Sequence, residues 1–152
     1  MKTIAEQIFE LAQQIAKRTT GFQERRGPGK KAGNGMTDAF LALLDAAVAN
    51  NFGAKVRRQE LVAPGMKYSF DFFIPSEDTV VEIALSLRNI VTEFEKDIFK
   101  CILANESGKP IKKLLLIGKD GSVKRQDGTG PRAIKSWVNR HCHIAVEVKE
   151  LT

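Results

Sequence analysis

The chain has 152 residues, of which 43% are hydrophobic and 28% charged. These values are those of one ordinary globular domain and exclude a disordered or fibrous protein. We expect a single domain over residues 1–152, with an N-terminal helix and a basic glycine-rich loop (1–35) before the core (36–152). No apolar run has the length of a membrane span, and the early acid Glu6 is untypical of a secretory signal. We therefore expect a cytoplasmic protein in which Cys101 and Cys142 are reduced thiols.

The net charge of +6 favours a polyanionic partner such as DNA. Part of this charge lies in a glycine-rich segment whose basic residues include Arg25, Arg26, Lys30 and Lys31. Such a loop can bring backbone N–H groups close to phosphate, so we expect it to contact nucleic acid. It contains neither a Walker pattern nor a dinucleotide-binding fingerprint, so nucleotide hydrolysis is not indicated. The alternative is a connector whose charges remain in water.

Apolar residues at helical spacing predict a helix over residues 3–18 and a second over 37–51, with Thr37 as its N-cap. Three strands are predicted next, over residues 54–62, 67–74 and 79–86. Short turns separate them, the first at Pro64-Gly65 and the second over residues 75–78. Because these turns are short, we expect antiparallel hairpins.

A third helix is predicted over residues 92–104, with Thr92 as N-cap and Glu95 completing a capping box. The run 113–117 is apolar from Leu114 onward and predicts a strand buried on both faces. A helix over 131–141, with Trp137 on its core face, and a strand over 144–151 complete the order. Hairpins followed by a helical crossover predict an α/β fold in which helices cover a mixed sheet.

Two acids, Asp71 and Glu82, interrupt the otherwise apolar second and third strands. A charge in such a place is unfavourable unless it is paired, hydrogen-bonded or bound to a metal. Two adjacent carboxylates suit Mg²⁺ or Mn²⁺, which could activate a water molecule for attack on a phosphate. Alternatively, the acids are structural and point outward or pair with a nearby lysine.

An acid on the second strand (Asp71) and another on the third (Glu82), followed by a helix and a strand, resembles the PD-(D/E)XK nuclease superfamily. The resemblance covers most of the chain from the second helix onward and implies a restriction-endonuclease-like mixed β-sheet. It also implies a DNA-cleaving phosphodiesterase in which these two residues bind the metal ion. Symmetric cutting of both strands would call for a homodimer.

The chain departs from that pattern at Ala84, which stands where the family has a lysine two residues after the second acid. Replacement amines are Lys67, expected on the same strand face as Asp71, and Lys100 on the following helix. Lys96 is disfavoured because it lies nearly opposite the apolar arc of that helix. Two further candidates are Glu95, expected to face the sheet as a third acid, and Arg88 as a phosphate contact.

A second acid-x-lysine pattern, Glu147-Val148-Lys149, is interpreted as a half-buried terminal strand with Glu147 and Lys149 facing solvent. Its nearest upstream acid, Asp127, is separated from it by a predicted helix rather than by a hairpin. Two alternatives to a nuclease stay open. The chain could be a nuclease-like nucleic-acid-binding module that has lost turnover, as Ala84 suggests, or an interaction protein in which the acids are structural.

Overall fold

The computed structural model describes residues 1–19, 21–22, 33–85 and 90–152. Its amino-terminal half contains helices α1 (Ile4–Arg18) and α2 (Gly33–Phe52) and then strands β1 (Arg57–Leu61), β2 (Ser69–Ile74) and β3 (Thr79–Ala84). Short 3₁₀ turns, Gly53–Lys55 and Pro75–Glu77, precede β1 and β3. The second half contains α3 (Ile90–Glu106), β4 (Lys113–Lys119), α4 (Ser122–Arg125), α5 (Thr129–Cys142) and β5 (Ala145–Leu151).

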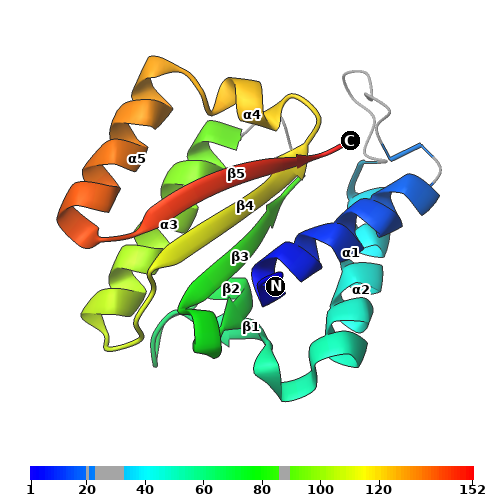
Figure 1. Cartoon of the computed structure of the whole chain (residues 1–152), viewed down its shortest axis with the longest axis horizontal. Coiled ribbons are helices and arrows are strands. Elements are labelled where there is room, and N and C mark those ends of the chain that lie inside the picture. The colour runs from blue at the N-terminus through cyan, green and yellow to red at the C-terminus, as the bar shows by residue number, and fades with distance from the viewer. Residues whose placement is uncertain (20, 23–32, 86–89) are drawn as a thin grey trace.

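The strands form one mixed sheet in the order β1-β2-β3-β4-β5. The first three strands are antiparallel neighbours joined by short connections, as their turn residues predicted. Helix α3 then carries the chain across one face of the sheet, so that β4 lies parallel to β3, and β5 lies parallel to β4. The expected mixed α/β sheet with helices on its faces is confirmed (Figure 1).

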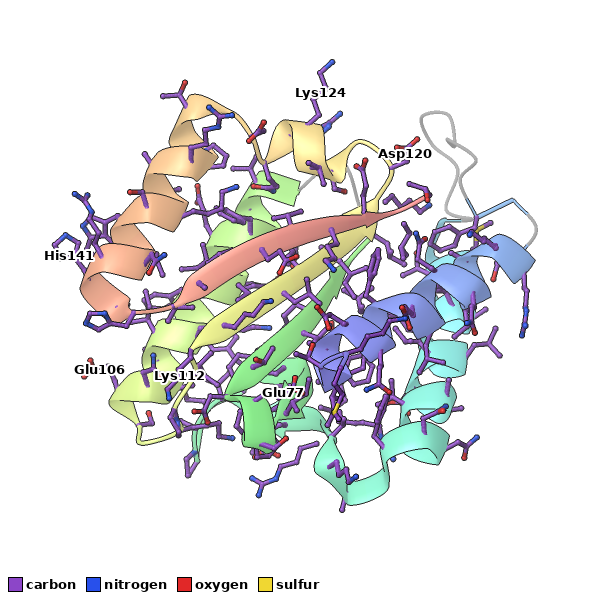
Figure 2. The ribbon with its side chains drawn as sticks, viewed as in Figure 1. Glu77, Glu106, Lys112, Asp120, Lys124 and His141 are labelled. Atoms are coloured by element: carbon purple, nitrogen blue, oxygen red, sulfur yellow. The ribbon has the colours of Figure 1, made fainter. Side chains whose placement is uncertain are left out.

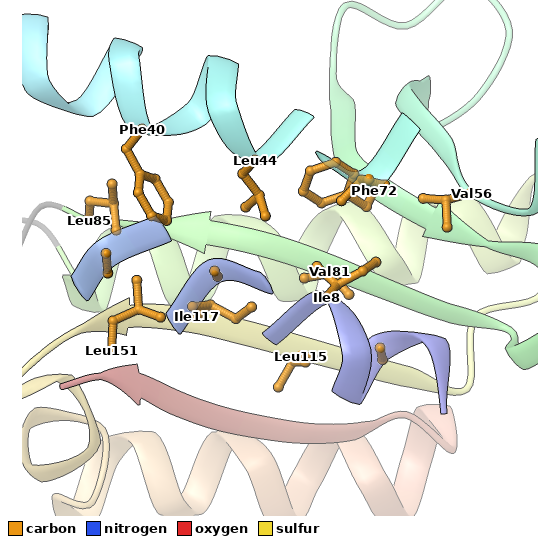
Figure 3. Packing of buried hydrophobic residues seen from close by; sticks show 14 of the residues in the cluster. Ile8, Phe40, Leu44, Val56, Phe72, Val81, Leu85, Leu115, Ile117 and Leu151 are labelled. Carbon is orange, nitrogen blue, oxygen red and sulfur yellow. The ribbon is translucent and has the colours of Figure 1, made fainter. Parts of the chain in front are cut away.

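Each face of the sheet has its own hydrophobic core. On one face, α1 and α2 pack through Ile8, Phe40 and Leu44 against Val81 and Ile117 of the central strands (Figure 3). On the other face, α3 and α5 pack against the side chains of alternate sheet residues: Val80, Ala84, Leu114 and Leu116. Because β4 contributes to both cores, it is buried on both faces, which explains its continuous apolar run.

Helix α1 begins one residue later than predicted, and its N-terminus is held by acceptors from two parts of the chain. Thr3 and Glu6 form a capping box. Glu77, labelled in Figure 2, accepts hydrogen bonds from the backbone N–H groups of Ile4 and Ala5, at 2.7 and 3.3 Å. These contacts fix α1 to the turn before β3, at one end of the sheet.

Several boundaries and orientations differ from the sequence predictions. Helices α2 and α3 begin at Gly33 and Ile90, so Thr37 and Thr92 lie within helices and neither is an N-cap. The short helix α4 was not predicted. Trp137 is 50% exposed rather than in the core, because Val138 is the residue of α5 that points inward. In the part of the chain that the structure describes, no helix combines the length and apolarity of a membrane span.

Candidate active site

Strands β2 and β3 bring Asp71 and Glu82 to neighbouring positions in the sheet. Their antiparallel register pairs Ile74 with Thr79, Phe73 with Val80 and Phe72 with Val81. The ladder ends at Phe72 and Val81, and Asp71 and Glu82 are the next residues of their strands. The two acids are close enough that the negative charge of Asp71 raises the pKa of Glu82.

The carboxylate of Asp71 replaces a backbone carbonyl as the acceptor for β3. Its Oδ2 accepts the backbone N–H of Ile83 at 2.8 Å, and its Oδ1 lies 3.4 Å from the Nε2 of Gln59. The Ser69 hydroxyl donates to the Oε1 of Gln59 at 3.2 Å and so orients the amide of that side chain. These contacts hold Asp71 beside the backbone of the residue that follows Glu82.

The strands are locally distorted at this position. Regular alternation would place Phe70 and Phe72 on one face of the sheet, yet they belong to opposite cores. Gln59, which lies opposite Asp71 in the β1–β2 register, has a φ of +51°, a left-handed value that is unfavourable for a residue other than glycine. The backbone is therefore strained where the candidate site lies.

Lys100, on the inward face of α3, lies against Glu82. Its Nζ is 2.6 Å from Glu82 Oε1 and 2.8 Å from the backbone carbonyl oxygen of Ser69. Both side chains are buried, with only 5% of Lys100 and 4% of Glu82 exposed. The ammonium also lies 5.6 Å from the centre of the Phe70 ring, a favourable cation–π distance. Helix α3 thus places an amine at the acid of β3.

A third acid, Asp97, lies one helical turn before Lys100. Its Oδ1 is 3.2 Å from Lys100 Nζ, and only 3% of the residue is exposed. The inward face of α3 therefore includes two charged residues among its apolar ones: Phe94, Asp97, Ile98, Lys100, Cys101 and Ala104. Glu82, Asp97 and Lys100 form a buried charged cluster between the sheet and α3.

Burial sets the electrostatics of this cluster. Desolvation raises the pKa of the Glu82 carboxyl well above its usual range, and the negative charges of Asp71 and Asp97 raise it further, while Lys100 opposes the shift. Burial likewise raises the pKa of Asp97 to about 6 against the attraction of Lys100. For Lys100, burial alone would lower the pKa, but Glu82 and Asp97 outweigh it and raise the pKa. The lysine is therefore a stable ammonium ion.

Cys101 lies next to this cluster but does not take part as a nucleophile. Burial raises the pKa of its thiol well above the usual range, and the charges of Glu82 and Asp97 add to the effect. The thiolate is the reactive form of cysteine, so this residue is chemically inert at neutral pH. Cys101 and Cys142 are both free thiols, as expected.

Asp71 and Glu82 are the residues that could hold a metal ion. Their carboxylate oxygens are the ligand type that Mg²⁺ and Mn²⁺ prefer, and the mutual repulsion that raises the pKa of Glu82 would be relieved by a cation. Within the described ranges, no group of three or more His, Cys, Asp or Glu residues is arranged to hold a metal. Two carboxylates still fit Mg²⁺, which commonly uses one or two and fills its remaining positions with water and phosphate.

The other residues suggested by sequence are not brought to this cluster. Lys67 was expected on the strand face of Asp71, but β2 begins only at Ser69, and Lys67 is exposed in the turn before it. Glu95 was expected to face the sheet and is instead exposed, because the inward face of α3 includes Asp97 in its place. The basic residues proposed as nucleic-acid contacts lie outside the described residues: Arg25, Arg26, Lys30, Lys31 and Arg88.

Sequence reasoning missed Asp97 and Gln59. Asp97 is three residues after Phe94 and one before Ile98, so a search for polar residues inside the apolar face of α3 could have found it. Nothing in the sequence marks the positive φ of Gln59. No known family model matches this chain, and no curated protein or solved structure matches it at a significant level.

Proposed function

We propose that this chain is a metal-dependent phosphodiesterase that hydrolyses DNA. The observation that carries the proposal is the position of Lys100, whose Nζ lies 2.6 Å from the carboxylate of Glu82. Ala84, two residues after Glu82, cannot supply an amine, and Lys100 supplies one from α3. Two acids on adjacent strands and one buried amine are the groups that the PD-(D/E)XK resemblance implies for hydrolysis of a phosphodiester.

The sheet topology supports a restriction-endonuclease-like fold. Three antiparallel strands precede a helix that crosses over to a parallel neighbour of the third strand. Asp71 and Glu82 lie on the second and third of these strands, where the PD-(D/E)XK resemblance puts its acids. The amine belongs to the crossover helix rather than to the third strand. The chain would therefore be a member of this superfamily in which the site lysine is supplied by the helix instead of the strand.

Asp71 and Glu82 would hold Mg²⁺ or Mn²⁺. When bound, the ion supplies a water molecule of lowered pKa and neutralises charge on the phosphate. The hydrogen bond from Ile83 N–H to Asp71 holds one carboxylate in place, and the Lys100 ammonium holds the other. Both acids are thus oriented before substrate binds. Such preorganisation is what a catalytic site needs.

Lys100 would act as a fixed positive charge. Because Glu82 and Asp97 keep it protonated, it is suited to stabilise negative charge that develops on the phosphate. It is not suited to remove a proton. The general base therefore has to be found among solvent and phosphate oxygens.

A second candidate function is a nucleic-acid-binding protein without turnover. The observation that favours it is the same ion pair, because Lys100 already neutralises Glu82 and would do so in a purely structural cluster. This protein would share the basic composition of the nuclease but would need no metal ion.

Cleavage of plasmid and labelled linear DNA with Mg²⁺ or Mn²⁺ tests the proposal. Wild type should cut, and Asp71→Asn, Glu82→Gln and Lys100→Met should each lower the rate by at least about 100-fold. The exposed pair on the same helix, Glu93 and Lys96, gives matched controls, and Glu93→Gln and Lys96→Met should cut like wild type.

Three results would separate the functions. Equal rates for wild type and the Asp71 and Glu82 variants would refute catalysis at this site. Salt-dependent DNA binding without cleavage, in either metal, would favour the second candidate. Neither binding nor cleavage would favour an interaction protein in which the acids are structural.

A further inference from the structure

Helix α3 carries two acid–lysine pairs of the same spacing in different surroundings. Glu93 and Lys96 form an ion pair of 3.0 Å whose side chains are 37% and 46% exposed. Asp97 and Lys100 form a pair of 3.2 Å whose side chains are nearly completely buried. The exposed pair is an ordinary surface ion pair that contributes little to the stability of the fold. The buried pair fixes the direction of an amine that faces the candidate site.

The Lys100 ammonium is held by oxygen atoms from three elements. Glu82 of β3 lies at 2.6 Å, the Ser69 carbonyl of β2 at 2.8 Å and Asp97 of α3 at 3.2 Å. An ammonium group has three N–H donors, so these oxygens are enough to engage all of them. Of the three oxygens, the one from Glu82 belongs to a residue that would also bind a metal ion.

A metal ion on Glu82 would change the surroundings of Lys100. The carboxylate would share its charge between the metal and the ammonium, and the two cations would repel each other. Lys100 then needs a second negative charge to remain beside Glu82 instead of turning away along its flexible stem. Asp97 provides that charge from the same helix, within 3.2 Å of the amine.

We infer that Asp97 is a positioning residue that holds the Lys100 ammonium at the reaction centre when Glu82 binds the metal ion. The inference rests on the proposed phosphodiesterase function. Asp97 touches neither metal nor substrate in this role and acts only through Lys100. The contact that carries this role is the one between its Oδ1 and the Lys100 Nζ, at 3.2 Å.

A role in stability explains the buried charge less well. Burial raises the pKa of Asp97 to about 6, so the charged form, which predominates at neutral pH, is disfavoured by folding. Asparagine has the same size and could accept a hydrogen bond from Lys100 without a charge. A carboxylate at this position is therefore better explained by what it does to the amine.

The experiment compares wild type, Asp97→Asn, Asp97→Glu, the metal-ligand variant Glu82→Gln and the matched control Glu93→Gln as full chains. Two quantities are measured: steady-state cleavage of labelled DNA in Mg²⁺, and calorimetric titration with Mn²⁺ alone. We expect Asp97→Asn to lower kcat by about 10- to 100-fold, with KM and Mn²⁺ affinity within about 2-fold of wild type. Asp97→Glu keeps the charge and should recover part of kcat, while Glu93→Gln should match wild type in every measurement.

Each other outcome refutes a definite claim. Wild-type kcat in folded Asp97→Asn would mean that Asp97 is only structural. Loss of Mn²⁺ affinity as large as that caused by Glu82→Gln would mean that Asp97 is a metal ligand, which also overturns the positioning role. A wild-type chain that never cleaves would refute the proposed function and the catalytic role of Asp97 with it. Failure of the positioning role alone is distinct, because wild type would cut while Glu82→Gln would not.

Discussion

The backbone N–H of Ile83 donates a hydrogen bond of 2.8 Å to the carboxylate of Asp71. Asp71 thus takes the place of a main-chain acceptor. Beyond the β2–β3 backbone pairs, the side of β3 that faces β2 is held by this side chain. A residue substituted at this position changes the sheet as well as the charge. Variants of the site therefore need stability measurements beside activity measurements.

Lys100→Met should destabilise the fold strongly, because it leaves Glu82 and Asp97 buried without a counter-charge. We expect a loss of about 3–5 kcal/mol in unfolding free energy at pH 7.5, measured by urea denaturation. The loss should shrink at pH 5, because the raised pKa values of both acids let them become neutral as the pH falls. Lys96→Met, in the exposed pair, should change stability by less than about 1 kcal/mol. Equal losses for the two lysines would contradict the buried pairing.

Asp97→Asn should stabilise the protein at neutral pH. The folded-state pKa of Asp97, about 6, lies above its ordinary value of 3.8, so its contribution to stability is fully present below pH 3.8 and is lost as the pH rises through 6. Relative to wild type, the variant should gain about 1–3 kcal/mol at pH 7.5 and nothing at pH 3.5. Denaturant titrations across this range test it. A variant less stable than wild type at pH 7.5 would show that the charge favours folding.

Gln59 offers a test of strain beside Asp71. A φ of +51° is sterically allowed for glycine and unfavourable for alanine. Gln59→Gly should therefore be more stable than Gln59→Ala by about 1 kcal/mol. In an unstrained strand the order would be reversed, because glycine has the greater unfolded-state entropy. Thermal unfolding of the two variants makes the comparison. Both lose the contact with Asp71 Oδ1, so both should cleave DNA more slowly than wild type.

Gly118, paired in register with Ala84, should not tolerate a side chain. A Cβ there would lie 2.2 Å from the Oγ and 2.7 Å from the Cβ of Ser122. Gly118→Ala should therefore cost about 1–3 kcal/mol of stability, and adding Ser122→Gly should restore part of it. At Gly130 a Cβ meets nothing within 4 Å, so Gly130→Ala serves as the control and should be neutral or slightly stabilising. Additive losses in the Gly118/Ser122 double variant would contradict the predicted clash.

Residues that act through local chemistry were predictable from the sequence. Pro64-Gly65 and the turn at 75–78 indicated the hairpins, and the second hairpin puts Asp71 and Glu82 on neighbouring strands. Lys100 was one of the amines considered, because its position on the predicted helix follows from spacing. The mixed sheet followed from the same pattern of elements.

Features that depend on packing were not predictable in this way. The pattern at Thr92 and Glu95 has the spacing of a capping box, but α3 begins two residues earlier, so it has no capping role. Phe99 is apolar but 56% exposed, and counting it with the apolar face of α3 moves the expected inward face toward Glu95. Asp97 was missed because prediction from hydrophobic periodicity assigns every charged residue to the exposed face of a helix, and Asp97 is buried.

The two halves of the candidate site would form at different moments of folding. Asp71 and Glu82 meet through a hairpin with a short turn, which is a local event. Lys100 reaches Glu82 only after α3 has docked on the sheet, which needs contacts between residues more distant in the chain. Under the proposed function, a chain with a paired hairpin and an undocked α3 would bind cations through its acids yet have no amine beside them. Cleavage would then report complete folding, whereas metal binding would not.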